Sequence, residues 1–397
     1  MLTISNKGRL MPESPIRKLV PYAEKAKKNG VKVFHLNIGQ PDIETPFSAI
    51  EAVKNSNIKV LAYSKSEGDY ELRNKICDYY SKINIKIDES QVIVTSGASE
   101  ALLFTIGSIM DPGDEIIIPE PFYANYNGFS VANGVNIVPI FSSIDNNFEL
   151  PKIQEFENLI SSNTKAILIC NPNNPTGYVY SYDEIKTLVE IVKKHNLFLI
   201  ADEVYREFTY DNVSHTSILQ FDDIKQHAIV IDSVSKRYSM CGARIGCIIS
   251  KNREFISTAM KFAQARLSPP TLAQIASTAA MDTGEDYFNK VINEYNDRRK
   301  TLVEGLNEIP GVKVSEPKGA FYCVVELPVN NSEHFAKWLL EEYSLNQETI
   351  MVAPAAGFYS TPNIGQNQVR IAYVLNQSDL KSCINILKNG LMEYLKQ

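Results

Sequence analysis

The sequence predicts an α/β fold, with a large domain built on a mostly parallel sheet flanked by helices and a smaller α+β domain. In the middle of the chain, short runs rich in Val, Ile and Leu alternate with helical patterns, an order typical of parallel strands joined by helices. Most of these runs are nearly continuous in apolar residues, as in strands that are covered on both faces. Polar segments directly follow several runs, and ligands of such sheets bind beyond the carboxyl ends of the strands.

The N-terminal arm and the large domain supply the first elements along the chain. In the arm, the pattern predicts a helix over 16–29 and a short strand over 33–38. The large domain has six predicted strands, over 92–95, 115–118, 165–170, 197–201, 228–231 and 245–249. Two helices are predicted between them, one over 99–110 that ends at the turn D-P-G-D and one over 182–195.

The pattern changes near residue 283. A long charged helix over 285–307 leads to a strand pair around 320–327 and 368–374, flanked by helices near 332–343 and 379–396. We therefore expect a large domain at 46–290 and a small domain made of residues 1–45 with 291–397.

Composition excludes several classes of protein. The net charge is -6 over 397 residues, without a Lys- or Arg-rich block, so nucleic acid and anionic membranes are not expected partners. The start of the chain lacks the apolar core of a secretory signal, and no apolar run approaches the roughly 18 residues of a membrane helix. The six cysteines form no C-x-x-C pair and the five histidines show no metal-ligand spacing. We expect a cytoplasmic protein without a metal site, whose cysteines are small buried side chains.

One short segment, S-V-S-K-R-Y-S-M-C-G-A-R-I-G over 233–246, gathers several functional groups in a single bend. The hydroxyls of Ser233 and Ser235 and the guanidinium of Arg244 can hold a phosphate. Lys236 would then lie next to the molecule that carries that phosphate. A solvated surface lysine is the alternative.

Three other segments follow predicted strands. T-S-G-A-S-E-A, over 95–101, opens a helix whose exposed N–H groups can bind an anion, or forms a tight turn with Ser99 as N-cap. The patterns G-x-G-x-x-G and G-x(4)-G-K-[ST] are absent there, which disfavours a nucleotide site. N-P-N-N-P-T-G, over 171–177, is a rigid turn. Asp202 closes the run L-F-L-I-A-D, where a buried carboxylate is costly without a partner; the alternative is an Asp that caps the following helix.

The lysine segment resembles the motif S-x-S-K-x(5)-G-x-R-x-G of class I aminotransferases and matches all six of its fixed positions. From about residue 30 to 375, the chain carries the other motifs of this family in the family's order. The resemblance implies the fold of the fold-type-I pyridoxal-phosphate transferases, which include the aspartate aminotransferases. It further implies pyridoxal 5'-phosphate as cofactor, Lys236 as the catalytic residue that forms a Schiff base with it, and ping-pong transfer of an amino group between an L-amino acid and a 2-oxo acid.

The resemblance also assigns the cofactor-binding residues. The cofactor's phosphate would meet the helix end at Gly97, Ala98 and Ser99 and the side chains of Ser233, Ser235 and Arg244. Its ring would stack on Tyr123, its protonated pyridine nitrogen would pair with Asp202, and its phenolic oxygen would accept hydrogen bonds from Asn174 and Tyr205. Tyr63 matches a tyrosine that reaches the phosphate of the neighbouring subunit, which implies a homodimer with shared active sites.

Substrate residues follow from the same resemblance. Arg370, in Q-V-R-I-A-Y, matches the arginine that grips the α-carboxylate, although a strand arginine is usually a surface residue. Asn174 and the backbone of Gly39 would assist it. A dicarboxylic substrate needs one more cation, for which Arg266 and Arg17 are the candidates. We expect aspartate or glutamate as donor and 2-oxoglutarate as acceptor.

Other functions stay open at this point. Some aspartate-using relatives carry a lysine where Ser99 stands, so an aminotransferase for aromatic or other neutral amino acids is an alternative. A β-lyase, decarboxylase or amine-cyclising synthase of the same fold would share Lys236, Asp202 and Arg370. A regulatory protein that kept the fold is disfavoured because Lys236 and Asp202 are both present.

Overall fold

A seven-stranded sheet forms the centre of the computed structural model, which describes residues 2–397. The strand order is β2-β8-β7-β6-β5-β3-β4, and β8 alone runs antiparallel to its neighbours β7 and β2. The bounds are β2 Val92–Thr95, β3 Glu115–Glu120, β4 Asn136–Phe141, β5 Thr164–Cys170, β6 Phe198–Asp202, β7 Ala228–Ser233 and β8 Gly246–Ile249. The prediction of an α/β fold with a mostly parallel mixed sheet is therefore confirmed.

All six strands predicted for this sheet are present, and the sequence missed only β4. That strand lies at the edge of the sheet, is only partly buried and contains Pro139. A strand with a proline and one exposed edge lacks the continuous apolar pattern of its buried neighbours.

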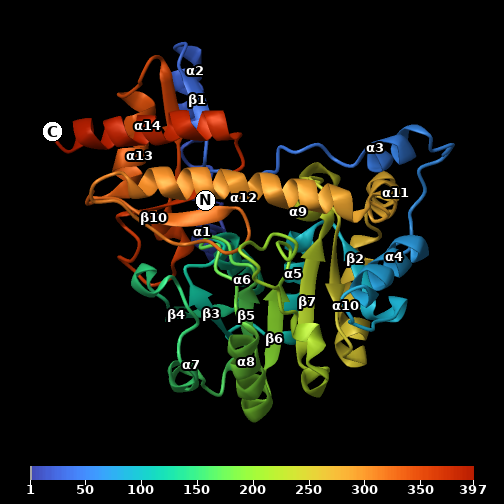
Figure 1. The fold of residues 1–397 in the computed structure, drawn as a ribbon. Coiled ribbons are helices and arrows are strands. Elements are labelled where there is room, and N and C mark those ends of the chain that lie inside the picture. The colour runs from blue at the N-terminus through green and yellow to red at the C-terminus, as the bar shows by residue number, and fades with distance from the viewer. Residues whose placement is uncertain (1) are drawn as a thin grey trace.

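Helices cover both faces of the sheet (Figure 1). They are α3 Phe47–Lys54, α4 Tyr70–Ser81, α5 Ala98–Ile109, α6 Asn125–Asn133, α7 Ile153–Leu159, α8 Tyr182–His195, α10 Arg253–Arg266 and α11 Thr271–Ala280. Because successive strand residues point to opposite faces, Ile116 packs into one hydrophobic core with α5 and α10, whereas Ile117 packs into a second core with α4 and α8. This two-sided burial explains the continuous apolar runs of the sequence.

The small domain contains two further sheets, ordered β12-β13-β10-β9 and β1-β11. Their strands are β1 Lys32–His35, β9 Lys313–Val314, β10 Tyr322–Glu326, β11 Glu348–Met351, β12 Ala353–Pro354 and β13 Gln368–Ala372. Its helices are α1 Asn6–Leu10, α2 Val20–Lys28, α13 Ser332–Glu341 and α14 Gln377–Tyr394. The predicted strand pair is β10 with β13, and the parallel partner of β1, β11, was not predicted.

One long helix links the two parts of the molecule. Helix α12, Glu285–Asn307, has the predicted bounds and runs across the molecule between the small domain and the α3–α11 side of the large domain (Figure 1). The helix continues unbroken through the expected boundary at 290/291, and the boundaries 46–290 and 1–45 with 291–397 stay a prediction. Among residues 2–397, no helix combines the length and the apolar character needed to cross a membrane.

Candidate active site

A cavity of about 650 Å³ lies beyond the carboxyl ends of β5, β6 and β7, between the sheet and the small domain. Each of the four motifs singled out in the sequence contributes to its wall. The predicted residues that line it are Gly39, Ala98, Ser99, Tyr123, Asn174, Asp202, Tyr205, Ser233, Ser235, Lys236, Arg244 and Arg370. Residues far apart in the sequence therefore meet where a parallel sheet binds its ligands.

Lys236 is placed by a short helix that begins where β7 ends. Ser233 is the N-cap of this helix, α9 (Val234–Arg237), and its Oγ accepts a hydrogen bond from the Ser235 N–H at 3.1 Å. The Lys236 ammonium points across the cavity and donates to the carbonyl of Gly39 at 2.8 Å. Lys236 is half-buried, so the alternative of a solvated surface lysine does not hold.

Two glycines let the first turn of α5 pack against the lysine segment. Gly97, the N-cap of α5, has φ 79°, and a Cβ there would lie 2.4 Å from Nη2 of Arg244. A Cβ on Gly246 would lie 2.6 Å from the carbonyl carbon of Gly97. Both positions therefore require glycine for Arg244 and the positive end of α5 to face the cavity together. Gly242 has open space around it, so nothing in the structure explains that glycine.

Asp202, at the end of β6, is buried and faces the cavity. Its Oδ2 accepts a hydrogen bond from the Tyr126 hydroxyl at 2.8 Å, and its Oδ1 has only a long contact of 3.5 Å with the Val204 N–H. Burial raises the pKa of Asp202 to about 6, while the hydrogen bonds oppose that shift. The residues that follow form a turn rather than a helix, so Asp202 is not a helix cap. Its Oδ1 is open to a further donor.

Arg370 on β13 is a buried cation, not the surface residue that strand arginines usually are. Its Nη1 donates to Oδ1 of Asn174 at 3.0 Å, and its Nη2 donates to the carbonyl of Asn37. Its Nε is buried without a hydrogen-bond partner, and burial lowers its pKa. A buried guanidinium held only by neutral groups is suited to a carboxylate ligand, which would offset its desolvation.

Hydroxyl and amide donors line the wall between Asp202 and Arg370. Nδ2 of Asn174 lies 3.5 Å from the hydroxyl of Tyr205, which lies 2.9 Å from the hydroxyl of Tyr322. A Cβ on Gly39 would overlap the Tyr322 hydroxyl at 1.7 Å, so only glycine fits there. Tyr123 presents its ring to the cavity, and its hydroxyl accepts from Nδ2 of Asn125.

Three predicted residues do not line this cavity, and one of them, Gly97, adjoins it as the N-cap of α5. Tyr63 is 79% exposed on the surface of the large domain. Arg266 forms an ion pair with Glu100 at 2.7 Å and donates to the carbonyl of Ser66 at 2.9 Å. Their roles in binding cofactor and substrate stay predictions. Arg17, the other candidate cation, does line the cavity.

Comparisons with known proteins agree with this geometry. The family model described as aminotransferase class I and II matches residues 31–387. The chain belongs to this family. It is 32% identical over 394 residues to an aspartate aminotransferase of Pyrococcus horikoshii, which covers 98% of this chain and 97% of that protein.

Solved structures of aminotransferases also match over nearly the whole chain. A single mutant of the Thermus thermophilus aspartate aminotransferase has a TM-score of 0.90 at 26% identity, covering 98% of this chain and 100% of that chain. An alanine aminotransferase from Pyrococcus furiosus has the same TM-score, 0.90, at 28% identity, with 98% and 100% covered. The predicted family, fold and transaminase activity are therefore confirmed, whereas the fold does not select the amino acid.

Class I and II aminotransferases depend on pyridoxal phosphate, and the donor set of the cavity fits that group. Lys236 offers an amine for the aldehyde. Oδ1 of Asp202, which has only the long contact with the Val204 N–H, can accept from a protonated ring nitrogen, and Asn174 and Tyr205 can donate to the phenolic oxygen. Arg244, beside the N-terminus of α5, offers charge and N–H groups for the phosphate.

Several contributors to the site were missed in the sequence. Tyr126, Tyr322 and Cys241 all touch predicted site residues, and the Cys241 sulfur lies 3.7 Å from the Lys236 amine. Single tyrosines and cysteines carry no periodic signal. Tyr126, however, follows Tyr123 by three residues, a spacing that puts two side chains on one face of a helical turn.

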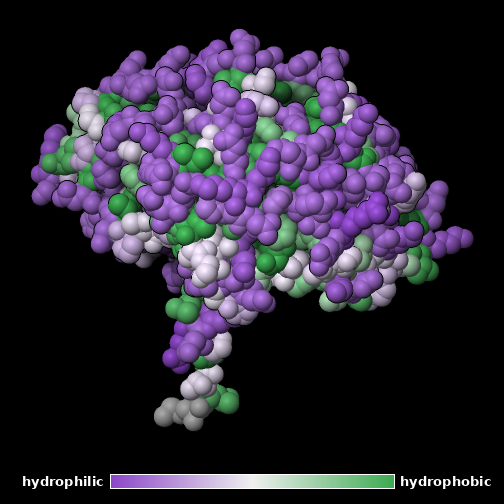
Figure 2. Space-filling model, turned by 90° about the horizontal axis from the view of Figure 1, so that it is seen from below, coloured by the Kyte–Doolittle hydropathy of each residue, from purple (hydrophilic) through white to green (hydrophobic). Residues whose placement is uncertain are grey.

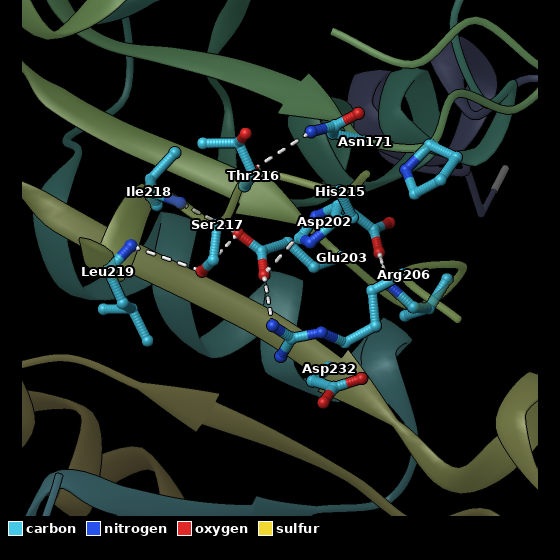
Figure 3. A network of polar contacts seen from close by, with 12 residues as sticks. Asn171, Asp202, Glu203, Arg206, His215, Thr216, Ser217, Ile218, Leu219 and Asp232 are labelled. Atoms are coloured by element: carbon cyan, nitrogen blue, oxygen red, sulfur yellow. Dashed lines mark hydrogen bonds and ion pairs between the residues drawn. The ribbon is translucent and has the colours of Figure 1, made fainter. Parts of the chain in front are cut away.

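A buried polar network lies behind the site (Figure 3). Oε1 of Glu203 accepts hydrogen bonds from the Ser217 hydroxyl at 2.9 Å and the Ile218 N–H at 3.2 Å, while Oε2 lies 3.8 Å from Arg206 and from His215. Desolvation raises the pKa of Glu203 to about 7. Because successive residues of an extended chain face opposite sides, Asp202 points to the cavity, whereas Glu203 points away from it and its hydrogen bonds hold the end of β6 to the segment around Ser217.

Proposed function

We propose that this aminotransferase uses pyridoxal phosphate to move the amino group of aspartate or glutamate to a 2-oxo acid such as 2-oxoglutarate. The observation that supports this most strongly is a single cavity that combines the amine of Lys236, the buried carboxylate of Asp202 and the buried guanidinium of Arg370.

The chain's own residues would bind and orient the cofactor. When bound, the cofactor supplies an aldehyde carbon and an electron-withdrawing ring that stabilises negative charge at the substrate's α-carbon. Asp202 would hold a proton on the ring nitrogen, since its carboxylate is otherwise a buried charge without a cation. Asn174 and Tyr205 would donate to the phenolic oxygen, and Tyr123 would pack against the ring.

The phosphate would be held where α5 begins. Ser233, Ser235 and Arg244 would contribute hydroxyls and a guanidinium, and Gly97, Ala98 and Ser99 would contribute the N-terminal turn of the helix. Anions bind at helix N-termini because unpaired N–H groups and the helix dipole both favour negative charge.

We propose that Lys236 moves the proton of the substrate's α-carbon. Its amine would serve as the base that takes the proton from the substrate's α-carbon and as the acid that gives the proton back. Its two hydrogen-bond partners, the Gly39 carbonyl and the Cys241 sulfur, are not carboxylates that would hold it as an ion pair. Arg370 would fix the α-carboxylate and thereby aim the α-carbon at Lys236.

Arg17 supports the choice of a dicarboxylic substrate. Four cationic side chains line the cavity, and the proposed roles above use Lys236, Arg244 and Arg370. Arg17 is the one left for a distal carboxylate. Arg266 could bind a distal carboxylate only in the cavity of a partner subunit, because in its own chain it is bound to Glu100 outside the cavity. The similarity of the chain to an aspartate aminotransferase of Pyrococcus horikoshii also supports a dicarboxylic substrate.

We propose a homodimer with shared active sites. The large apolar side chains of Val60 and Leu61, which lie just before Tyr63 in the same exposed segment, are more than 60% exposed. The N-terminal segment also stands away from the body of the molecule (Figure 2). Exposed apolar clusters of this kind mark protein interfaces, and Tyr63 within one would reach the cavity of the second copy.

A half-reaction tests the proposed function. The protein loaded with pyridoxal phosphate is mixed with aspartate, glutamate, alanine or phenylalanine in the absence of any 2-oxo acid. We expect one equivalent of 2-oxo acid per site, conversion of the cofactor to pyridoxamine phosphate, and the fastest reaction with aspartate or glutamate. Continuous release of ammonia or carbon dioxide would instead identify a lyase or decarboxylase. A faster reaction with phenylalanine or alanine would contradict the proposal that the substrate is a dicarboxylic amino acid.

A further inference from the structure

Tyr126 contacts the carboxylate that is proposed to meet the cofactor's ring nitrogen. Its hydroxyl donates to Oδ2 of Asp202 at 2.8 Å, and both side chains are buried. This is the shortest hydrogen bond that Asp202 accepts, since the Val204 contact measures 3.5 Å. Burial keeps the pKa of Tyr126 well above its ordinary value, so the hydroxyl stays protonated and acts as a donor.

The ring of Tyr126 is fixed by packing on two sides. It meets the Tyr123 ring edge-on, with centroids 5.5 Å apart and an interplanar angle of 86°, and it stacks on Phe122 at 6.0 Å. Tyr126 lies on α6, one turn beyond Tyr123. One side chain therefore touches both the residue proposed to stack on the cofactor ring and the residue proposed to pair with its nitrogen.

We propose that Tyr126 is a positioning residue that keeps Asp202 ionised and turns its other oxygen, Oδ1, towards the ring nitrogen of the cofactor. This inference rests on the proposed role of Asp202. A hydrogen bond donated to a carboxylate stabilises the charged form. Without the bond, Asp202 becomes more basic, and the proton that it shares with the ring nitrogen moves towards the carboxylate. The ring then withdraws electrons less strongly from the substrate's α-carbon.

Tyr126→Phe removes the hydroxyl alone and tests the inference through the cofactor rather than through turnover. The protein is loaded with pyridoxal phosphate labelled with ¹⁵N in the ring, and the nitrogen's chemical shift reports its protonation. Tyr80→Phe is a matched control, because the buried Tyr80 hydroxyl donates to a different buried carboxylate, Asp232, at 3.1 Å.

We expect the ¹⁵N shift of the wild type and of Tyr80→Phe to be that of a pyridinium. Tyr126→Phe is expected to move it towards neutral pyridine, in the direction of Asp202→Asn. The dissociation constant of the cofactor, measured by equilibrium dialysis, should rise about tenfold in Tyr126→Phe, equivalent to about 1.4 kcal/mol. It should rise less than twofold in Tyr80→Phe.

The double variant separates positioning from general loss of stability. If Tyr126 acts through Asp202, Tyr126→Phe adds little to the effect of Asp202→Asn on cofactor affinity, because coupled residues are not additive. Additive effects, or a Tyr126→Phe spectrum identical to the wild type while Asp202→Asn differs, overturn the inference. If Asp202→Asn itself leaves the spectrum and affinity unchanged, the proposed role of Asp202 fails and this inference fails with it.

Discussion

Replacing Gly97 by alanine tests how the phosphate end of the cavity is built. The added Cβ would lie 2.4 Å from Nη2 and 2.9 Å from Cζ of Arg244, well inside contact distance, so the guanidinium must move. Loss of a charge-assisted hydrogen bond to phosphate costs about 1.5–3 kcal/mol, which corresponds to a fall in cofactor affinity of about 10- to 150-fold. The backbone at Gly97, with φ 79° and ψ 171°, lies in a region that essentially only glycine adopts, so alanine there adds a strain of about 1–3 kcal/mol to the folded protein.

Gly30 provides the control that separates these two effects. Its φ is +85°, but an added Cβ would meet nothing within 4 Å. Gly30→Ala should therefore lower the melting temperature through backbone strain alone, while the dissociation constant of pyridoxal phosphate, measured by equilibrium dialysis, stays at the wild-type value. Equal cofactor affinities in the two variants would show that Gly97 does not set the position of Arg244 for the phosphate.

Three further perturbations test other parts of the site. Arg17→Ala should reduce kcat/KM for aspartate at least tenfold more than for phenylalanine, and an equal reduction for both would show that Arg17 does not recognise the distal carboxylate. Arg266→Ala, measured with the same two substrates, tests the other candidate arginine. Asp202 has a folded pKa of about 6 against an ordinary value of 3.8, so in the cofactor-free protein its burial cost is full above pH 6 and is relieved as the pH falls towards 4. Asp202→Asn should therefore raise the free energy of unfolding by about 2 kcal/mol more at pH 7.5 than at pH 4, and urea titrations with no such difference would contradict the burial effect. Arg370→Lys keeps the charge but loses the planar fork, so KM for the amino acid should rise about tenfold or more, and an unchanged KM would place the α-carboxylate elsewhere.

The sequence predicted the sheet well because its strands are buried on both faces. Short continuous apolar runs such as those of β2 and β7 are typical of strands that are buried on both faces. The edge strand β4, with its proline and partial burial, lacked that signal. The pairing of β1 with β11 joins segments more than 300 residues apart, and no local pattern encodes such a contact.

The candidate-site residues that could be predicted are those that belong to short contiguous sequence motifs. Lys236, Asp202 and Asn174 follow strands in strings that local spacing can identify. Tyr126 and Tyr322 act through contacts that only the folded chain creates. The ion pair of Arg266 with Glu100 is also tertiary, so the sequence left that arginine as a free candidate.

Reductive trapping tests the central claim, that Lys236 carries the cofactor, most directly. The protein loaded with pyridoxal phosphate is reduced with borohydride, digested and examined by mass spectrometry. We predict one phosphopyridoxyl group per chain, on the peptide that contains Lys236, and none in the same peptide from Lys236→Ala. A stoichiometric label on another lysine, or retention of the label in Lys236→Ala, would contradict the account.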